Sequence, residues 1–202
     1  MASADIEDAF SSSLVVAWNG DSLASMSAPS GPNWPATIAT ARLTLRPAHE
    51  DDVEIYHRLL TDQDVRNYLG GPVEGERLTA YVQGYARQPY VFSIVTTEDG
   101  KMVGAVNIAS DGRYGRREIS YSFLPEHWGH GYALEAVRAA LGWAFDAVPS
   151  EDRSIIAVTQ EDNSRSRRLL EKLGMEQIDS FIELDAPKAV YSKISDDHPG
   201  TA

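Results

Sequence analysis

Apolar and polar positions follow two different periods along this chain between about residue 40 and residue 194. Leu43 and Leu45 alternate with polar residues, which is the period of a half-buried strand. Between His49 and Leu60 the apolar residues recur at helical spacing instead, with acids in the first turn, which predicts a helix. The same patterns predict strands at 43–47, 90–95, 102–108, 118–123, 154–159, 177–184 and 188–194, and helices at 49–60, 73–87, 131–145 and 164–173.

The order of these elements predicts the class of the sheet. Two short sequences, Glu98-Asp99-Gly100 and Asp111-Gly112, join neighbouring strands and favour tight turns. Other strands are separated by helices, so the chain does not alternate strictly between strand and helix. We therefore predict an α/β fold of the α+β type, with a mixed, mostly antiparallel central sheet and helices on both faces.

Length and composition restrict the classes of protein and of ligand that this chain fits. The 202 residues fit one domain with spare length. Because cysteine is absent, disulfides, thiolate metal cages and a cysteine nucleophile are excluded, and we expect no bound metal. The net charge of −12 disfavours nucleic acid, which needs clustered Lys and Arg. Apolar runs stay far below the roughly 20 residues of a membrane helix, so we expect a cytoplasmic protein.

The first 38 residues differ from the rest because they carry four acids and no Lys or Arg. We expect a disordered or loosely packed arm at 1–38, a folded domain at 39–195 and a frayed end at 196–202. Two explanations of the arm stay open. Either translation starts at Met26, or the arm packs on the partner subunit of a homodimer through Trp18 and Trp34.

A glycine-rich loop, Trp128-Gly129-His130-Gly131-Tyr132-Ala133, lies between a predicted strand and the apolar helix 131–145. Such a turn exposes backbone N–H groups at the positive end of the helix dipole, which suits a phosphate or pyrophosphate. A tight turn without a ligand is the alternative. His127 and His130 have no third ligand in the sequence, so we do not predict a metal site there.

This loop, followed by Glu135-Ala136, resembles the acetyl-CoA pyrophosphate loop of the GNAT N-acetyltransferases. Trp128 in its first position is similar to the branch that contains the ribosomal-protein N-terminal acetyltransferases. A second block, Asn163 to Met175, resembles the N-x-x-S-x-x-x-x-E-K-x-G-F block of that branch. The resemblance covers about residues 40 to 194. It implies a GNAT fold with acetyl-CoA as co-substrate, in a V-shaped split between the strands that end near 123 and 159.

The resemblance also implies which residues hold acetyl-CoA. Backbone N–H groups of Phe123 and Leu124 are expected at a β-bulge, where they would bind the pantetheine arm and the acetyl carbonyl. Asn163 precedes the predicted helix 164–173 and is expected to cap it. A contact of Asn163 with the pantetheine is also expected, and the cap alone is the alternative. Arg165, Arg167 and Arg168 either reach the phosphates or form a solvated basic face. The full expected cofactor-binding set is Phe123, Leu124, Trp128, Gly129, His130, Gly131, Tyr132, Ala133, Asn163 and Arg168.

Two residues are candidates for the proton transfers of acetylation. Glu118 shares a polar strand face with Ser120 and Ser122 inside a sheet that should be buried, so it is the candidate general base. A salt bridge with Arg116 or Arg117 is the alternative. Ser166 lies on the apolar side of its helix and is the candidate general acid; a small packing residue is the alternative.

The acceptor is expected to be a primary amine. Candidates for attracting its positive charge are Asp62, Asp64, Glu74, Glu76, Glu183 and Asp185, with ordinary loop acids as the alternative. The acidic body favours a small polycationic amine, such as an aminoglycoside-type antibiotic or a polyamine. A protein N-terminus, suggested by the branch resemblance, and a lysine side chain are the alternative acceptors. A CoA-binding sensor without catalysis is the alternative of another class, which Glu118 and Ser166 disfavour.

Overall fold

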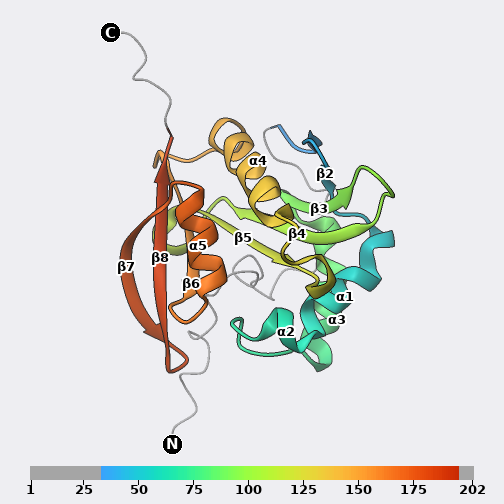
Figure 1. Cartoon of the computed structure of the whole chain (residues 1–202), viewed down its shortest axis with the longest axis horizontal. Helices are drawn as coiled ribbons and strands as arrows, with labels where there is room; N and C mark the ends of the chain where they lie inside the picture. The colour runs from blue at the N-terminus through green and yellow to red at the C-terminus, as the bar shows by residue number, and fades with distance from the viewer. Residues whose placement is uncertain (1–32, 196–202) are drawn as a thin grey trace, which may run out of the picture.

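The computed structural model describes residues 33–195 and folds them around one eight-stranded sheet (Figure 1). The strands are β1 (Ile38–Ala39), β2 (Leu43–Pro47), β3 (Val91–Thr96), β4 (Met102–Ala109), β5 (Arg117–Phe123), β6 (Ser154–Gln160), β7 (Glu176–Glu183) and β8 (Ala186–Ile194). The helices are α1 (Val53–Thr61), α2 (Gln63–Arg66), α3 (Gly75–Gly84), α4 (Tyr132–Ala147) and α5 (Ser164–Lys172). Short 3₁₀ turns are η1 (Glu50–Asp52), η2 (Tyr85–Arg87), η3 (Arg113–Gly115) and η4 (Pro125–His127).

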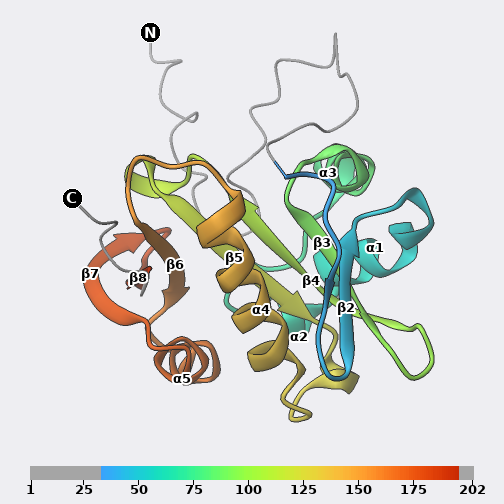
Figure 2. The same cartoon turned by 90° about the horizontal axis from the view of Figure 1, so that it is seen from above.

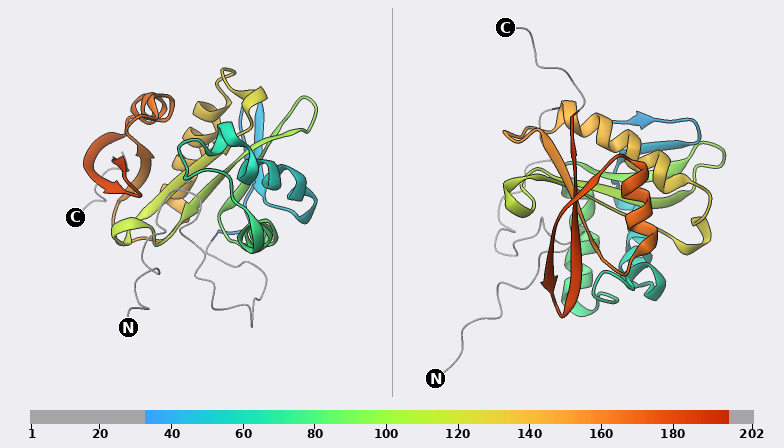
Figure 3. Two further views of the ribbon diagram at one scale, coloured as in Figure 1. Left: turned by 90° about the horizontal axis from the view of Figure 1, so that it is seen from below. Right: turned by 60° about the vertical axis from the view of Figure 1, so that its left-hand side comes forward.

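The strand order β1-β2-β3-β4-β5-β6-β8-β7 is antiparallel at every junction except one. β5 and β6 run parallel, and in the described chain they pair at two positions, Arg117 with Ile155 and Glu118 with Ile156. Beyond these pairs the strands diverge. A wing of β6, β7, β8 and α5 therefore stands apart from the body that carries α4 (Figures 2 and 3). The predicted mixed, mostly antiparallel sheet and its V-shaped split are confirmed.

One face of the sheet packs against α4 and forms the main core. α4 buries small residues such as Ala136, Ala140 and Ala144 against the strands, because the helix lies close to the sheet. Trp34 completes this core, with ring centroids 4.9 Å from Phe92 and 6.2 Å from Trp143.

Trp34 overturns one reading of the N-terminal arm. Its side chain is 8% exposed and packs within its own subunit, so the expected contact of Trp34 with a partner is wrong. The packed core also begins before the boundary predicted at residue 39. Trp18 and Met26 lie outside the described residues.

The opposite face of β3 and β4 is covered by α1 and α3. Tyr56 and Tyr85 stack there with ring centroids 4.0 Å apart, and Leu59 and Leu60 are buried beside them. The short elements β1 and α2 were not predicted, because two and four residues are too few to show a period. Among residues 33–195, no helix is long and apolar enough to cross a membrane.

Candidate active site

The glycine-rich loop enters α4 with both of its glycines in the left-handed region. Gly129 has φ of 80° and Gly131 has φ of 79°, a conformation that costs a side-chain-bearing residue free energy. Gly131 is the N-cap of α4, and no side chain of the described chain caps this end. The intrahelical ladder begins with Glu135 N–H donating to the Gly131 carbonyl at 3.2 Å. The preceding N–H groups are thus left for an anion.

A network that the sequence analysis missed braces this loop. The Arg42 guanidinium donates to the His130 carbonyl at 2.9 Å and pairs with the Glu135 carboxylate at 2.6 Å. Thr40 Oγ1 donates to the same carboxylate at 2.7 Å. Burial alone would raise the pKa of Glu135, but the hydrogen bonds from Thr40 and Arg42 outweigh it and hold that pKa below its usual value. The carboxylate therefore stays charged and fixes the start of α4.

Trp128 connects the loop to both sides of the split. Its Nε1 donates to the Phe123 carbonyl at 2.8 Å, which occupies the last acceptor of β5. The Arg165 guanidinium of α5 lies 4.9 Å from the Trp128 ring centroid. Arg168 instead donates to Ser164 on its own helix at 3.3 Å, and Arg167 donates to Tyr191 at 3.0 Å. Of the three basic residues, Arg165 has the contact with the loop.

The end of β5 departs from one expectation. β4 and β5 keep an unbroken register up to Gly104 opposite Phe123, and Leu124 N–H donates to the Val103 carbonyl at 3.0 Å. The predicted bulge at Phe123 and Leu124 is therefore wrong, and Leu124 N–H is already used within the sheet. Since hydrogen-bonding directions alternate along a strand, the Phe123 N–H points the other way, toward the split.

Glu118 lies at the closed end of the split and is 4% exposed. Its Oε2 accepts a hydrogen bond from the Arg113 backbone N–H at 3.1 Å. Burial raises the pKa of Glu118, opposed by that hydrogen bond and by the Arg113 charge. A carboxyl group with a raised pKa is suited to taking a proton near neutral pH.

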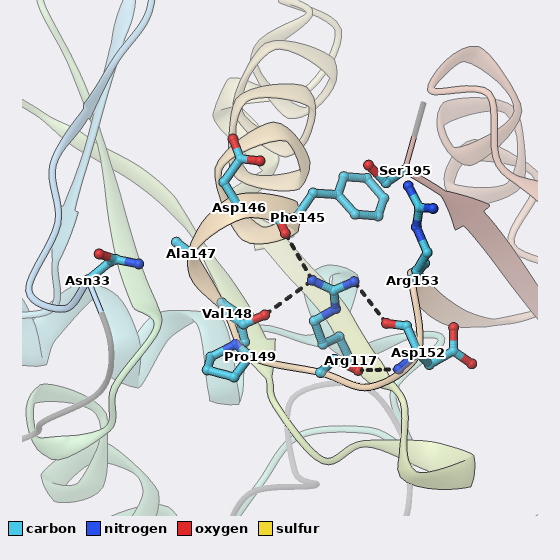
Figure 4. A pocket seen from close by; sticks show the side chains of 11 residues that line it. Asn33, Arg117, Phe145, Asp146, Ala147, Val148, Pro149, Asp152, Arg153 and Ser195 are labelled. Carbon is cyan, nitrogen blue, oxygen red and sulfur yellow. Dashed lines mark hydrogen bonds between the residues drawn. The ribbon is translucent and has the colours of Figure 1, made fainter. Parts of the chain in front are cut away.

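The alternative reading of Glu118 as a salt-bridge partner is wrong. Arg116 Nε instead pairs with Asp152 Oδ2 at 2.8 Å. Arg117 donates to backbone carbonyls at the end of α4, among them Val148 at 3.1 Å (Figure 4). Both guanidinium groups are thus directed to the loop after α4. A cavity of about 490 Å³ opens beside Arg117, at the far end of α4 from the glycine-rich loop, so it is not the split.

Gly112 is a site residue that the sequence marked only as a turn. A Cβ built on it would lie 2.5 Å from Glu118 Cβ and 3.0 Å from Glu118 Oε2. Its φ of −86° is ordinary, so the requirement for glycine comes from space and not from backbone strain. The Glu118 side chain therefore lies directly over Gly112.

The same turn is tied to the wing. The Arg113 guanidinium pairs with Glu183 at 2.9 Å and stacks on Phe181, 3.9 Å from the ring centroid. Tyr114 donates to Asp179 at 2.8 Å. The turn that holds Glu118 is thus anchored to β7.

Ser166 lies in the first turn of α5, on the other side of the split. The Asn163 side chain caps α5 by accepting from the Ser166 N–H at 3.1 Å, which confirms the predicted cap. The Ser166 hydroxyl lies 2.8 Å from the Tyr121 hydroxyl, across the split on β5. Because Glu118 and Tyr121 point to opposite faces of β5, the candidate base and acid flank the split instead of touching.

The acids predicted for the acceptor site do not all lie on one face of the sheet, and some of them have structural partners. Asp62 caps α2 by accepting from Asp64 N–H at 2.9 Å, so it has a structural task. Glu183 lies on the face of the sheet that also carries Glu118 and pairs with Arg113. Lys188, buried on this face, has its pKa lowered by burial. Within residues 33–195, no group of three or more metal-ligating side chains occurs.

Comparison with known proteins decides the family. The acetyltransferase (GNAT) domain matches residues 42–176, which include the split, the loop and both candidate proton-transfer residues. The chain belongs to the GNAT acetyltransferase family. This GNAT enzyme is an N-acetyltransferase that uses acetyl-CoA, in agreement with the resemblance of the loop and of the Asn163 block.

Several relatives share the whole domain. The uncharacterized protein YkkB of Bacillus subtilis is 30% identical over 78% of this chain and 95% of its own length. A GNAT acetyltransferase from Bacillus anthracis superposes with a TM-score of 0.69 at 26% identity, over 79% of this chain and 98% of that one.

More distant structures share the fold but differ in their acceptors. Ribosomal-protein-S5-alanine acetyltransferase of Vibrio fischeri has a TM-score of 0.62 at 18% identity, over 80% of this chain and 98% of that one. Spermidine N-acetyltransferase of Vibrio cholerae, in complex with CoA and spermine, has a TM-score of 0.63 at 19% identity, over 77% and 96%. The fold alone therefore does not select the acceptor of this GNAT enzyme.

Proposed function

We propose that this chain transfers the acetyl group of acetyl-CoA directly to a primary amine, and that the amine belongs to a small polycation. The observation that carries the proposal is the split between β5 and β6. It has an uncapped helix N-terminus at its open end and the buried Glu118 carboxyl at its closed end.

The residues around the split fit acetyl-CoA. The N–H groups at the start of α4 would hold the pyrophosphate, because they combine free donors with the positive end of the helix dipole. The Phe123 N–H would bind the pantetheine arm or the thioester carbonyl, since it points into the split and its own carbonyl is held by Trp128. Arg165, beside Trp128, is close enough to the loop to neutralise phosphate charge. Acetyl-CoA supplies the activated acetyl group, and the chain supplies the proton transfers.

Glu118 would take the proton of the amine. Its carboxyl is desolvated and its pKa is raised, so the proton is held more tightly than by an exposed glutamate. The carboxyl faces the side of the sheet that α1 and α3 cover in part, so the acceptor would enter from that side. Ser122 Oγ on the same face is buried and has no hydrogen-bond partner in the described chain. An unpaired hydroxyl on the same face of β5 as the base is a ready contact for an acceptor.

Ser166 would protonate the departing sulfur. The Asn163 cap fixes the Ser166 backbone at the start of α5, and its hydroxyl faces β5 across the split. Since the acid lies on the cofactor side and the base on the acceptor side, the acetyl group would pass between them within the split.

Charge favours a cationic acceptor. Apart from the four acids of the first 38 residues, the chain carries 26 acids and 18 bases. An acidic surface raises the local concentration of polycations. A protein N-terminus is the second candidate, and the Asn163 to Met175 block, which resembles the N-terminal acetyltransferases, favours it.

The test is an assay of CoA release with acetyl-CoA, a thiol-reactive dye and a panel of amines. The panel contains polyamines, aminoglycosides, peptides with free N-termini, and the same peptides with blocked N-termini and a free lysine. We expect a polyamine or an aminoglycoside to give the highest kcat/KM. If a peptide with a free N-terminus has the highest kcat/KM, the acceptor is a protein N-terminus and not a small polycation. Tight CoA binding without stimulation by any amine would instead support a sensor.

The assignments of a homodimer and of a cytoplasmic location stay predictions. Sedimentation of the full chain would measure the oligomeric state, and fractionation of the source cell would measure the location.

A further inference from the structure

One hydrogen bond crosses the split between its two walls. The Tyr121 hydroxyl on β5 lies 2.8 Å from the Ser166 hydroxyl on α5, and the two residues are 45 positions apart in sequence. Tyr121 follows the last β5–β6 pair, at Glu118, by three residues, which is about 10 Å along a strand. The two hydroxyls therefore meet where the strands have already separated, and Tyr121 points to the α5 side.

The environment of Tyr121 keeps its phenol protonated. Burial raises the pKa of Tyr121 to about 12, opposed by the hydrogen bond with Ser166. A protonated phenol can donate to the Ser166 oxygen, which leaves the single Ser166 proton free to point elsewhere. The Asn163 cap fixes the Ser166 backbone but not the rotation of its hydroxyl. Among the described side chains, Tyr121 is the one whose hydroxyl is bonded to this hydroxyl.

We infer that Tyr121 is a positioning residue that acts through Ser166. Its O–H donates to the Ser166 oxygen and so aims the Ser166 proton at the CoA sulfur. When the bond between the acetyl carbon and sulfur breaks, the Ser166 proton moves to the sulfur and forms the thiol. The Tyr121 proton shifts to the Ser166 oxygen in the same step, and solvent then returns a proton to the tyrosine oxygen. This inference rests on the proposed role of Ser166.

The structure offers a matched control. Tyr191 is another buried tyrosine whose hydroxyl is bonded to α5, accepting from Arg167 Nε at 3.0 Å and donating to Glu171 at 3.3 Å. Tyr191→Phe removes an anchor of α5 without touching Ser166. If the Tyr121 hydroxyl served only to hold the helix, Tyr191→Phe and Tyr121→Phe would have similar effects.

The experiment compares the wild type, Tyr121→Phe, Ser166→Ala, the double variant and Tyr191→Phe. We expect Tyr121→Phe to lower kcat about 10- to 100-fold. This is less than the full effect of removing a general acid, because Ser166 itself is kept. The KM for acetyl-CoA should change less than about twofold. The double variant should be no slower than the slower single variant, because both changes remove one proton path. Tyr191→Phe should keep kcat within about twofold.

The possible failures are distinct. If Tyr121→Phe retains the wild-type kcat, or if its loss multiplies with that of Ser166→Ala, the inference is overturned while the proposed function stands. Equal losses in Tyr121→Phe and Tyr191→Phe would show a structural anchor and also overturn it. A wild type that transfers acetyl to no amine removes the proposed function, and the inference with it. Thermal unfolding of each variant checks that it is folded.

Discussion

The two sides of β5 treat their polar groups differently. On the cofactor side, carbonyl and hydroxyl groups that border the split have partners: the His130 carbonyl accepts from Arg42, the Phe123 carbonyl accepts from Trp128, and the Ser166 hydroxyl is bonded to Tyr121. The N–H groups at the start of α4 are left for the ligand. On the acceptor side, Ser122 Oγ has no partner in the described chain, and burial raises the pKa of Glu118.

This difference has a physical meaning. Paired groups are fixed before a ligand arrives, so binding costs little ordering, whereas desolvated groups with few partners carry a free-energy cost that a ligand can relieve. The groups that brace the glycine-rich loop are thus fixed for binding, whereas Glu118 is desolvated for reaction. Changes around Glu118 should therefore act on kcat, and changes to the groups that brace the loop should act on the KM for acetyl-CoA. Ser166 and Tyr121 border the loop side of β5, but they act on the chemical step and so on kcat.

The largest effect is expected from Glu118→Gln. The amide cannot take a proton, so kcat should fall about 100-fold or more. The wild-type rate should decline as the pH falls through the raised pKa of Glu118, at a higher pH than an ordinary glutamate would give, because only the ionised base is active. Initial rates from pH 5 to 9 measure this. The fall of the rate at low pH should be absent in Glu118→Gln. If the variant keeps this fall, another group is responsible for it.

Gly112→Ala should have the next largest effect. The new Cβ would meet Glu118 Cβ at 2.5 Å, so the carboxyl must move from its position over the turn. We expect kcat to fall about tenfold, since misplacement of a catalytic group by about 1 Å is costly, while the KM for acetyl-CoA is kept. Steady-state kinetics with both substrates separates the two constants.

Gly142→Ala is the control for Gly112→Ala, because nothing lies within 4 Å of a Cβ at that exposed helical position. Its kinetics should match the wild type. An equal loss in both alanine variants would argue against the contact with Glu118.

Arg42→Ala tests the cofactor side. The change removes the donor to the His130 carbonyl and leaves Glu135 with fewer partners. We expect the KM for acetyl-CoA to rise about five- to tenfold with kcat changed less than about twofold, because the loop is loosened but the chemistry is untouched. Arg138→Ala, at an exposed position of α4, is the matched loss of charge. A fall in kcat alone would contradict the assignment of Arg42 to binding and of Glu118 to the chemical step.

The smallest effect concerns stability. Because burial raises the pKa of Glu118, the folded protein binds this proton more tightly than the unfolded chain does. The resulting loss of stability sets in as the pH rises above the ordinary glutamate range and is complete above the raised pKa. Glu118→Gln should therefore melt a few degrees higher than the wild type at pH 8. The difference should vanish at about pH 4, and calorimetry at the two pH values measures it.

The sequence predicted most elements because their periods are local. The alternation from Glu118 to Phe123 assigned the two faces of β5, and both proved to carry the expected side chains. The place of Asn163 before a helical run predicts a cap, and the structure confirms it. The β-bulge failed because the register of β4 on β5 depends on both strands, and no residue in β5 marks it.

The pattern of neighbouring residues in the sequence thus determined the strands and helices and the glycine-rich entry to α4. It also determined the faces of β5 on which Glu118 and Tyr121 lie. Only the tertiary structure decided what those groups meet. Tyr121 and Ser166 are 45 residues apart, and Arg42 and Glu135 are 93 residues apart. Periodicity arises between residues a few positions apart, whereas contacts over such separations depend on how the whole sheet packs. The split itself exists because β6 leaves β5 after two paired positions, which neither strand encodes alone.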